Sequence, residues 1–444
     1  MPNYRQRIFA KKLKMKVKLL VAIIAGISVL YGCNKDTVII PETVVYPAIA
    51  TDKHPKVLTT TPNGIVLNNG GYGSSMVQDP TDKAVFYLLT DRGPNVAEAA
   101  TNSIMIATPD FVPQIGKFRL KGDSLTLESV ILLKNSNGVN LNGLPNPIGA
   151  GSTGESPFDI NNNPLSTSID GIDSEGMAMA ADGSFWISDE YGPHLIHFDK
   201  TGKTIEKINP FSSGRKLPLV LAKRRPNRGM EGLTITPDGK TIVGIMQFPL
   251  YNPSSAAIAN SLVIRMVTFD ITSGETKQFV YMMDNTTLQA VSEITAIDNN
   301  NFLVIERDGL FATDANKSTI FKKIFKISLT GATDISDAAN SANGKLFGGK
   351  TVEELKDAAT LATNGIVPVT KTLIVDLMKD IPTLYPHDKA EGLVIINSTT
   401  IAVSNDDDFG ITGANKIYQK KILIGNGKVD GNGIYFIKLT TPLF

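Results

Sequence analysis

The sequence predicts an all-β protein, and more narrowly a β-propeller of five or six blades. Short runs rich in β-branched and aromatic residues recur along the chain, separated by turns of Gly, Asp and Asn. One pattern recurs with departures in five units: Glu-Gly, a strand, a turn, a strand, then an acidic loop ending in Gly. Four-stranded units at irregular intervals of roughly 50 to 100 residues are typical of propeller blades with inserted loops.

The N-terminal segment predicts export. Seven basic residues and no acidic ones precede Cys33, and an apolar run extends from Leu19 to Leu30. Such a run is short for a bilayer span and is typical of a signal peptide. Leu30-Tyr-Gly-Cys33 resembles a bacterial lipobox, which predicts a lipoprotein signal peptide over 1–32 and lipidation of Cys33. A plain membrane anchor with an incidental cysteine is the alternative. Residues 33–56 then form a tether, and 57–444 the propeller domain.

The charge balance excludes nucleic acid as a partner. Without the seven N-terminal cations, 37 of the 44 basic residues remain against 43 acidic ones. A mildly acidic body lacks the basic surface that nucleic acids require, but it is compatible with cation binding. Cys33 is the only cysteine, so no disulfide framework holds the fold.

The strands follow the same order in each unit. The first unit starts at Ser75 and has strands over 85–90, 114–120 and 125–133. The second has strands over 177–181, 184–188, 195–198 and 204–208. The third has strands over 233–236, 241–246, 262–270 and 275–281. The fourth has strands over 294–297, 302–305, 324–329 and 371–377, and the fifth over 393–397, 400–404 and 434–439.

Three other segments interrupt or flank these units. Residues 134–169 are rich in Asn, Gly, Pro and Ser and predict a long loop. Residues 351–361 show helical periodicity and predict one short helical insert. Residues 56–67 are a candidate for a sixth blade, formed together with the end of the chain. The near absence of helices between strands excludes a doubly wound α/β fold.

Carboxylates mark the same end of every predicted unit. The first strand of each blade lines the channel of a propeller. The glutamates at the start of these strands are Glu175, Glu231, Glu293 and Glu391. The loops after the second strands add Asp91, Asp189, Glu190, Glu306, Asp308, Asp406, Asp407 and Asp408. The pattern therefore predicts a ring of carboxylates at one mouth of the channel.

Such a ring repels itself unless something offsets its charge, and either a bound hard cation or paired arginines could do so. Carboxylate oxygens are preferred ligands of calcium and magnesium, so we expect Glu175, Glu231, Glu293, Glu391 and Asp406 to be metal ligands. Arg92, Arg228 and Arg307 adjoin the motifs and are candidates for binding an anionic substrate. The alternative is that the glutamates cap the blade backbones and the acidic loops are solvated turns.

Three residues of the second unit are candidates for proton transfer. Asp189 and Glu190 are predicted bases, and His194 follows them as a possible acid or base. A surface histidine is the alternative for His194. The sequence has no Gly-x-Ser-x-Gly, which excludes a serine-elbow esterase, and no Walker or dinucleotide motif.

At these motifs the sequence resembles the phytase-like family, described as "esterase-like activity of phytase". The matching segments are Leu89-Thr-Asp-Arg-Gly93, Asp173-Ser-Glu-Gly176, Trp186-Ile-Ser-Asp-Glu-Tyr-Gly192, Asn227-Arg-Gly-Met-Glu-Gly232, Ile305-Glu-Arg-Asp308, Ala390-Glu-Gly392 and Ser404-Asn-Asp-Asp-Asp-Phe-Gly410. The resemblance implies an exported propeller that hydrolyses phosphate or carboxylic esters, with a small anionic ester as its substrate. With the lipobox it implies an envelope lipoprotein, held at the membrane only by its lipid. The alternative is a non-catalytic surface propeller that binds a glycan or protein and holds a structural cation.

Overall fold

Four-stranded blades repeat five times in the part of the chain that the structure describes: three are separate antiparallel sheets, and the other two are joined into one eight-stranded sheet. The structure is a computed structural model, and it describes residues 44–53, 55–98, 101–285, 289–414 and 416–444. The predicted signal peptide, Cys33 and most of the predicted tether lie outside these residues. The sheets confirm the prediction of a β-propeller, and the number of blades is five.

Each of the first four blades is a meander whose strands follow the chain from the inside outward. The first blade consists of β4 (Tyr72–Gln78), β5 (Val85–Thr90), β8 (Gln114–Lys121) and β9 (Ser124–Leu132). The second consists of β11 (Ser174–Met179), β12 (Phe185–Asp189), β13 (His194–Phe198) and β14 (Thr204–Ile208). The third consists of β15 (Met230–Ile235), β16 (Thr241–Met246), β17 (Val263–Asp270) and β18 (Thr276–Met282). The fourth consists of β19 (Ala290–Ala296), β20 (Asn301–Arg307), β21 (Lys322–Ser328) and β22 (Thr370–Asp376).

The fifth blade joins both ends of the described chain. Its strands β23 (Leu393–Asn397), β24 (Thr400–Ser404) and β27 (Gly433–Lys438) come from the C-terminal part. Its outermost strand is β1 (Ile49–Asp52), which pairs antiparallel with β27 and parallel with β9 of the first blade. The propeller therefore begins before residue 57, and β1 lies inside the segment predicted as a tether. Local sequence patterns do not reveal a partner almost 390 residues away.

The predicted sixth blade is wrong. Within residues 56–67, β2 (Val57–Thr60) pairs with β3 (Val66–Asn68) in a separate two-stranded sheet. Both edges of β27 are already occupied by β24 and β1, so the end of the chain has no free edge for another strand.

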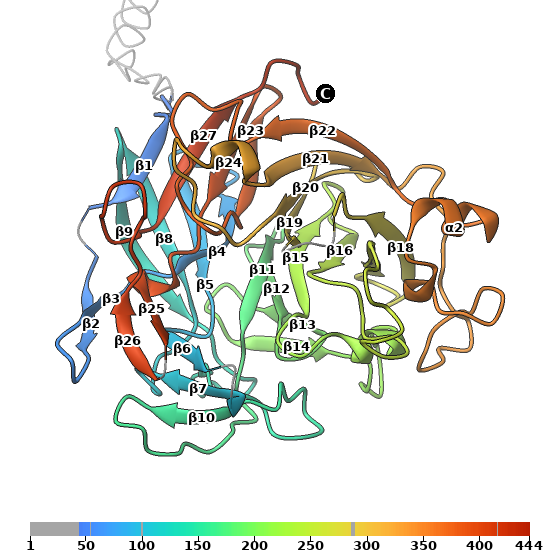
Figure 1. The fold of residues 1–444 in the computed structure, drawn as a ribbon, viewed down its shortest axis with the longest axis horizontal. Coiled ribbons are helices and arrows are strands. Elements are labelled where there is room, and N and C mark those ends of the chain that lie inside the picture. Colours follow the sequence, from blue (N-terminus) through green and yellow to red (C-terminus); the bar gives the residue numbers. More distant parts are fainter. Residues whose placement is uncertain (1–43, 54, 99–100, 286–288, 415) are drawn as a thin grey trace, which may run out of the picture. The chain divides into compact units, whose positions relative to one another are not determined.

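The first strands of the five blades form a closed inner ring. They contact one another in the order β4, β11, β15, β19 and β23, and β23 contacts β4 again (Figure 1). Apolar side chains fill the space between neighbouring blades. Leu89 and Ile115 pack against Ile187 between the first two blades, and Leu303 packs with Ile401 between the last two. This packing fixes the inner ends of the strands, where the predicted carboxylates lie.

Glycine is required where two inner strands approach closely. A Cβ on Gly232 would lie 2.7 Å from Ile294 N and 2.8 Å from the carbonyl carbon of Glu293, both backbone atoms of the next blade. Gly232→Ala is therefore expected to lower the free energy of unfolding by about 1–3 kcal/mol, measured by urea denaturation. A Cβ on Gly214 would meet no other part of the structure within 4 Å, so Gly214→Ala should change stability by less than about 0.5 kcal/mol. Equal effects of both substitutions would contradict the close approach.

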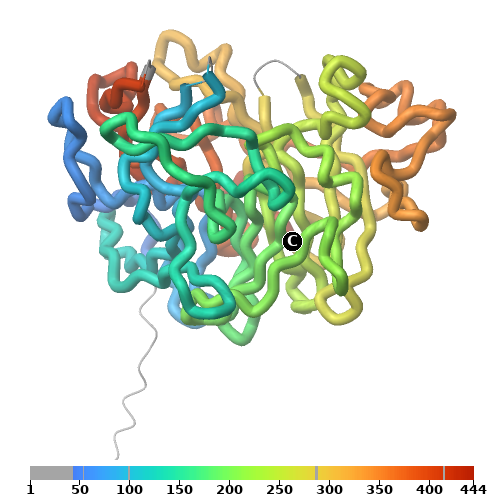
Figure 2. Tube along the Cα trace, turned by 90° about the horizontal axis from the view of Figure 1, so that it is seen from below, coloured from blue at the N-terminus to red at the C-terminus, as the bar shows by residue number. Residues whose placement is uncertain are grey.

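Small accessory sheets lie beside the first and fifth blades. They consist of β6 (Asn95–Glu98) with β7 (Ser103–Ile106) and β10 (Ser156–Asp159), and of β25 (Ile411–Ala414) with β26 (Ile417–Lys420). Val96, Met105, Phe409 and Tyr418 share one apolar cluster, which joins these sheets to each other. The segment between β9 and β11, predicted as a loop over 134–169, contains β10 and runs from the first blade to the second (teal to green in Figure 2).

The helical insert lies between β21 and β22. It contains η4 (Glu353–Leu355) and α2 (Ala358–Thr363), so the helix expected over 351–361 is divided into two short pieces. Val352, Leu361 and Ile366 pack on Val263 and Val280 of the third blade. Figure 1 shows α2 beyond β18, at the outer edge of that blade. The other short helices are η2 (Leu219–Lys223), η3 (Lys317–Thr319) and η5 (Asp408–Gly410).

None of the helices among the described residues has the length and apolar character needed to cross a bilayer.

Candidate active site

A cavity of about 520 Å³ lies where the inner strands begin and the second strands end. Both kinds of charge line it. The acidic side chains are Asp91, Asp173, Glu175, Glu190, Glu231, Glu391 and Asp408. The basic side chains are Arg92, Arg225, Arg228, Arg307 and Lys389. The antiparallel hairpins thus bring residues from all five blades to one mouth of the channel.

The register of the hairpins explains which residues face the cavity. An extra residue enters the first strand of the second, third and fourth blades, where the pairing shifts by one. This position holds Glu175, Glu231 and Ser292, and by the same register Glu391 in the fifth blade. In the five blades, the corresponding position at the end of the second strand holds Asp91, Glu190, Gln247, Arg307 and Asp406 in turn. All of these except Asp406 line the cavity, and Ser292 on the first strand of the fourth blade does not.

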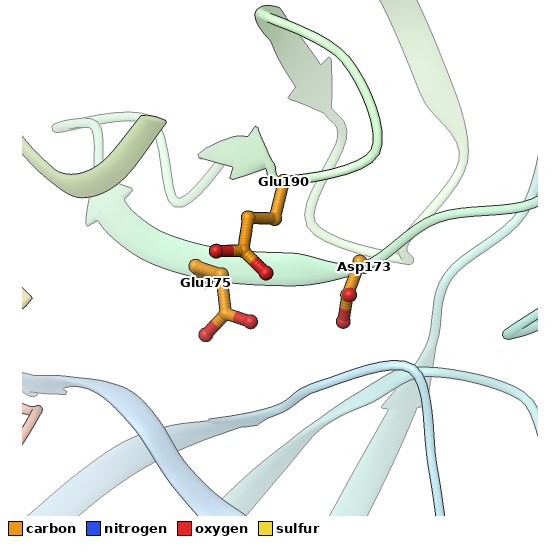
Figure 3. Close-up of side chains that lie close together, drawn as sticks. All are labelled: Asp173, Glu175 and Glu190. Carbon is orange, nitrogen blue, oxygen red and sulfur yellow. The ribbon is translucent and has the colours of Figure 1, made fainter. Parts of the chain in front are cut away.

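Three carboxylates of the second blade come together in the cavity. Oxygen atoms of Asp173, Glu175 and Glu190 lie within 4.8 Å of one another. Figure 3 shows the carboxyl groups of Glu175 and Glu190 close together, with Asp173 beside them. Asp173 and Glu190 are almost completely buried, whereas Glu175 is partly exposed. We call these three residues the carboxylate trio.

Burial and mutual repulsion disfavour the charged forms of these carboxyls. Burial, together with Glu231 and Asp173, raises the pKa of Glu175 well above its usual range. The pKa of Glu190 is raised well above its usual range by burial and Glu231. Burial raises the pKa of Asp173 to about 6, although Arg92 opposes the shift. A bound divalent cation would reverse these shifts, because it favours the ionised carboxylates.

Three carboxylate oxygens at this cavity have no hydrogen-bond partner among the described residues. They are Oε1 of Glu190, Oε2 of Glu231 and Oε2 of Glu391, and all three are buried. The other oxygens of two of these groups are used: Gln247 Nε2 donates to Glu231 Oε1 at 2.5 Å, and Arg307 Nη2 to Glu391 Oε1 at 2.6 Å. A buried acceptor without a donor is unfavourable. These carboxylate oxygens therefore fit a hard divalent cation, because such cations prefer oxygen ligands.

The three predicted arginines all line the cavity, but two of them are engaged by carboxylates. Arg92 Nη1 donates to Glu155 Oε2 at 3.0 Å, and its Nε lies 3.5 Å from Asp173 Oδ2. Arg307 bridges Glu391 and the Oγ of Ser292. The Arg228 side chain keeps 37% of its surface exposed, with Nη1 3.8 Å from Glu190 Oε1. Arg228 is thus the predicted arginine that is most available to a ligand.

Glu293 does not lie at the acidic cavity, contrary to its prediction as a metal ligand. It occupies the position that is glycine in the neighbouring blades, one residue beyond Ser292. Its carboxylate accepts hydrogen bonds from Ser75 Oγ at 2.5 Å, Leu233 N at 3.0 Å and Ile294 N at 2.9 Å. Glu293 therefore ties three blades together, and it lines a second cavity at the apolar part of the channel.

Asp406 is also placed differently from the prediction. It does not line the cavity, and both of its oxygens are used. Lys389 Nζ donates to Oδ2 at 2.6 Å, and the backbone N–H of Asp408 donates to Oδ1 at 3.0 Å. Asp406 thus holds Lys389, which itself lines the cavity.

Asp189 and His194 lie behind the wall of the cavity. Asp189 Oδ2 is 2.6 Å from His194 Nδ1, and Oδ1 accepts the backbone N–H of Asp173 at 3.0 Å. Both side chains are buried and neither lines the cavity. Their predicted role in direct proton transfer is therefore not supported by their placement. The hydrogen bonds give Asp189 a positioning role, because it fixes the backbone of Asp173.

The predicted acids of the fourth blade are buried away from the cavity, where they pair with lysines of the two outer strands of that blade. Glu306 Oε2 pairs with Lys371 Nζ at 2.6 Å, and Asp308 Oδ1 pairs with the buried Lys322 Nζ at 2.7 Å. In this blade Arg307, between the two acids, is the residue that reaches the cavity.

Sequence reasoning did not place four charged residues at the site, among them Arg225, which lines the cavity. Asp173 and Lys389 each stand two residues before a cavity glutamate, so strand alternation could have placed them on the same face. Glu155 reaches Arg92 from the long segment between β9 and β11, and its sequence carries no signal for this contact.

The raised pKa values predict an inverse pH dependence of stability without metal. Burial and the nearby charge of Glu391 raise the pKa of Glu231 to about 7. Burial and the nearby charge of Asp406 raise the pKa of Glu391 to about 7 as well. Above about pH 4 the unfolded chain releases protons that the folded protein still holds on these two glutamates. The stabilisation that comes from this protonation is lost as the pH rises to about 7. With chelator, the free energy of unfolding should therefore fall over this range.

Calcium should oppose that fall, because it binds the ionised carboxylates. Urea denaturation at several pH values, with chelator and with calcium, measures both effects. The Glu231→Gln/Glu391→Gln double variant serves as the control and should show a shallower fall with chelator. The same slope in the variant and the wild type would contradict this assignment.

Solved structures similar to this chain have low sequence identity to it. Hydrazine synthase of Kuenenia stuttgartiensis is 12% identical to this chain. The alignment covers 79% of this chain and 81% of the synthase chain, with a TM-score of 0.34. A luciferin-regenerating enzyme is 10% identical, covers 88% and 98%, and has a TM-score of 0.34. Neither likeness bears on the reaction.

Sequence comparison is more specific. A protein of Arthroderma benhamiae, described as "Uncharacterized secreted protein", is 26% identical over 245 residues, which are 46% of this chain and 46% of that protein. The match thus spans about half the length of that relative. Residues 68–409, which include all five inner strands and every carboxylate of the cavity, match the family described as "Phytase-like: Esterase-like activity of phytase". This chain therefore belongs to the phytase-like family.

Proposed function

We propose that this protein is an exported hydrolase of phosphate or related anionic esters, assisted by calcium or magnesium at the carboxylate trio. The observation that carries the proposal is the close approach of the carboxylates of Asp173, Glu175 and Glu190 in a cavity where buried oxygens of Glu190, Glu231 and Glu391 have no hydrogen-bond partner among the described residues. Membership of a family named for phytase and esterase activity supports the reaction class. The cavity volume of about 520 Å³ suits a small substrate.

The trio would hold the cation, with Glu231 and Glu391 close enough to influence it electrostatically. A bound divalent cation supplies Lewis-acid polarisation of an ester oxygen and a more acidic water. Glu231 has one free oxygen and a pKa raised by burial to about 7, so it is suited to exchange a proton with the reacting group near neutral pH. Arg228 stands at the same cavity and can bind an anionic group.

Location follows from separate observations. The secreted relative and the signal-peptide pattern support export. We propose that lipid attached to Cys33 holds the protein at the cell envelope, as the lipobox pattern predicts.

Hydrolysis assays with and without a cation test the proposal. The purified protein should release phosphate from phytate or an aryl phosphate with calcium or magnesium, and lose this activity with chelator. Activity that persists with chelator would overturn metal assistance. Stabilisation by calcium without turnover of any phosphate or carboxylic ester would overturn the hydrolase and favour the non-catalytic surface propeller.

A further inference from the structure

A tight turn at the rim of the cavity presents two arginines. The turn consists of Arg225, Pro226, Asn227 and Arg228, and the backbone N–H of Arg228 donates to the carbonyl of Arg225 at 3.0 Å. Proline pre-sets the second position, and Asn227 has φ +52°, a value that asparagine tolerates better than most residues. The turn therefore fixes the backbones of both arginines at its two ends.

The guanidinium group of Arg225 is available to a ligand. Its Cζ lies 5.1 Å from the centre of the Phe248 ring, and its side chain has no ion pair or hydrogen bond to any residue that the structure describes. The residue is exposed, yet it lines the cavity together with Phe248 and the carboxylate trio. Stacking on an aromatic ring restricts the guanidinium plane and leaves its N–H groups free to donate.

Two other arginines of the cavity are buried and paired with carboxylates, unlike Arg225. Arg92 and Arg307 have side-chain exposures of 8% and 11%, and each is held by a carboxylate. Their charges are therefore used to stabilise the acidic wall. Arg225 has no such partner, and Arg228 approaches Glu190 at 3.8 Å while 37% of its side chain remains exposed.

We propose that Arg225 and Arg228 form an anion subsite at the rim, so that the preferred substrates carry a second anionic group besides the one that reacts. The identity of the reacting group rests on the proposed function, whereas anion binding at the rim does not. A guanidinium fork binds phosphate and carboxylate oxygens through paired hydrogen bonds. The ligand class is thus a small molecule with two anionic groups, such as a sugar bisphosphate.

Calorimetric titration with two defined probes tests this subsite. Fructose 1,6-bisphosphate and fructose 6-phosphate differ by one phosphate group. With calcium present, the wild type should bind the bisphosphate at least about tenfold more tightly, as expected for a charged hydrogen-bonded contact. Arg225→Gln should lose most of this preference. Lys200→Gln removes the same charge at an exposed turn away from the cavity and should keep it.

The outcomes separate this subsite from the proposed function. An equal preference in Arg225→Gln and wild type, or no measurable binding of either probe, would overturn the subsite. A preference that depends on Arg225 supports the subsite even if no ester is hydrolysed, and that second result would count only against the hydrolase. Far-ultraviolet circular dichroism of Arg225→Gln should match the wild type, because the side chain is exposed.

Discussion

Arg265→Met is expected to lower the free energy of unfolding by about 3–5 kcal/mol, measured by urea denaturation with chelator present. Arg265 Nε and Nη2 donate to the two oxygens of Glu353, at 2.5 and 3.1 Å, and the two side chains are 1% and 0% exposed. Glu353 belongs to the helical insert, whereas Arg265 lies in β17 of the third blade. Removing the arginine leaves a buried carboxylate without its counter-ion, and the insert loses this ion pair to the blade.

A double variant separates the charge from the packing. In Arg265→Met/Glu353→Gln the buried charge is gone, and the amide oxygen can still accept the hydrogen bond that Asn252 Nδ2 gives to Glu353 at 2.9 Å. At least half of the lost stability should return. A double variant no more stable than Arg265→Met would show that the unpaired charge is not the cause.

Glu190→Gln is expected to reduce kcat/KM for phosphate esters by at least about 100-fold, because a metal site supplies several kcal/mol of transition-state stabilisation. Glu190 follows β12 and joins Asp173 and Glu175 in the carboxylate trio. The amide has the same shape as the carboxylate, so the fold should be retained while the charge that attracts the cation is lost. Initial rates at several calcium concentrations measure the effect.

Glu275→Gln is the matched control, because Glu275 is exposed at a hairpin of the third blade and does not line the cavity. Its kcat/KM should equal that of the wild type. If a high calcium concentration restores the activity of Glu190→Gln, the substitution has mainly lowered the affinity for calcium. A rate within about threefold of the wild type at low calcium would exclude Glu190 from the site.

The repeated strand patterns were sufficient to predict the propeller, because each blade is built from local hairpins with strong turn signals. Both errors in the fold involve distant partners. β1 pairs with β27 and β9, and this pairing depends on closure of the whole ring, which short-range patterns do not encode. The same closure explains why residues 56–67 do not form a sixth blade.

The site was predictable at the level of its blades but not of each residue. Glu175, Glu231 and Glu391 were found from the Glu-Gly motif, and they line the cavity. The prediction misplaces Glu293 because Ser292-Glu293 takes the strand register that Glu-Gly takes in the neighbouring blades. A shift of one residue moves a side chain to the other face of a strand, so Ser292 takes the place expected for a carboxylate. The pairing of Asp406 with Lys389 depends on a loop conformation that the motif does not specify.

Calcium titration of the metal-free protein by calorimetry tests the carboxylate trio most directly. The wild type is expected to bind calcium at the trio, and Glu175→Gln/Glu190→Gln is expected to lose this binding while Glu275→Gln retains it. Binding of calcium by the double variant with the same affinity and stoichiometry as the wild type, or no binding by the wild type, would contradict a metal site at Asp173, Glu175 and Glu190.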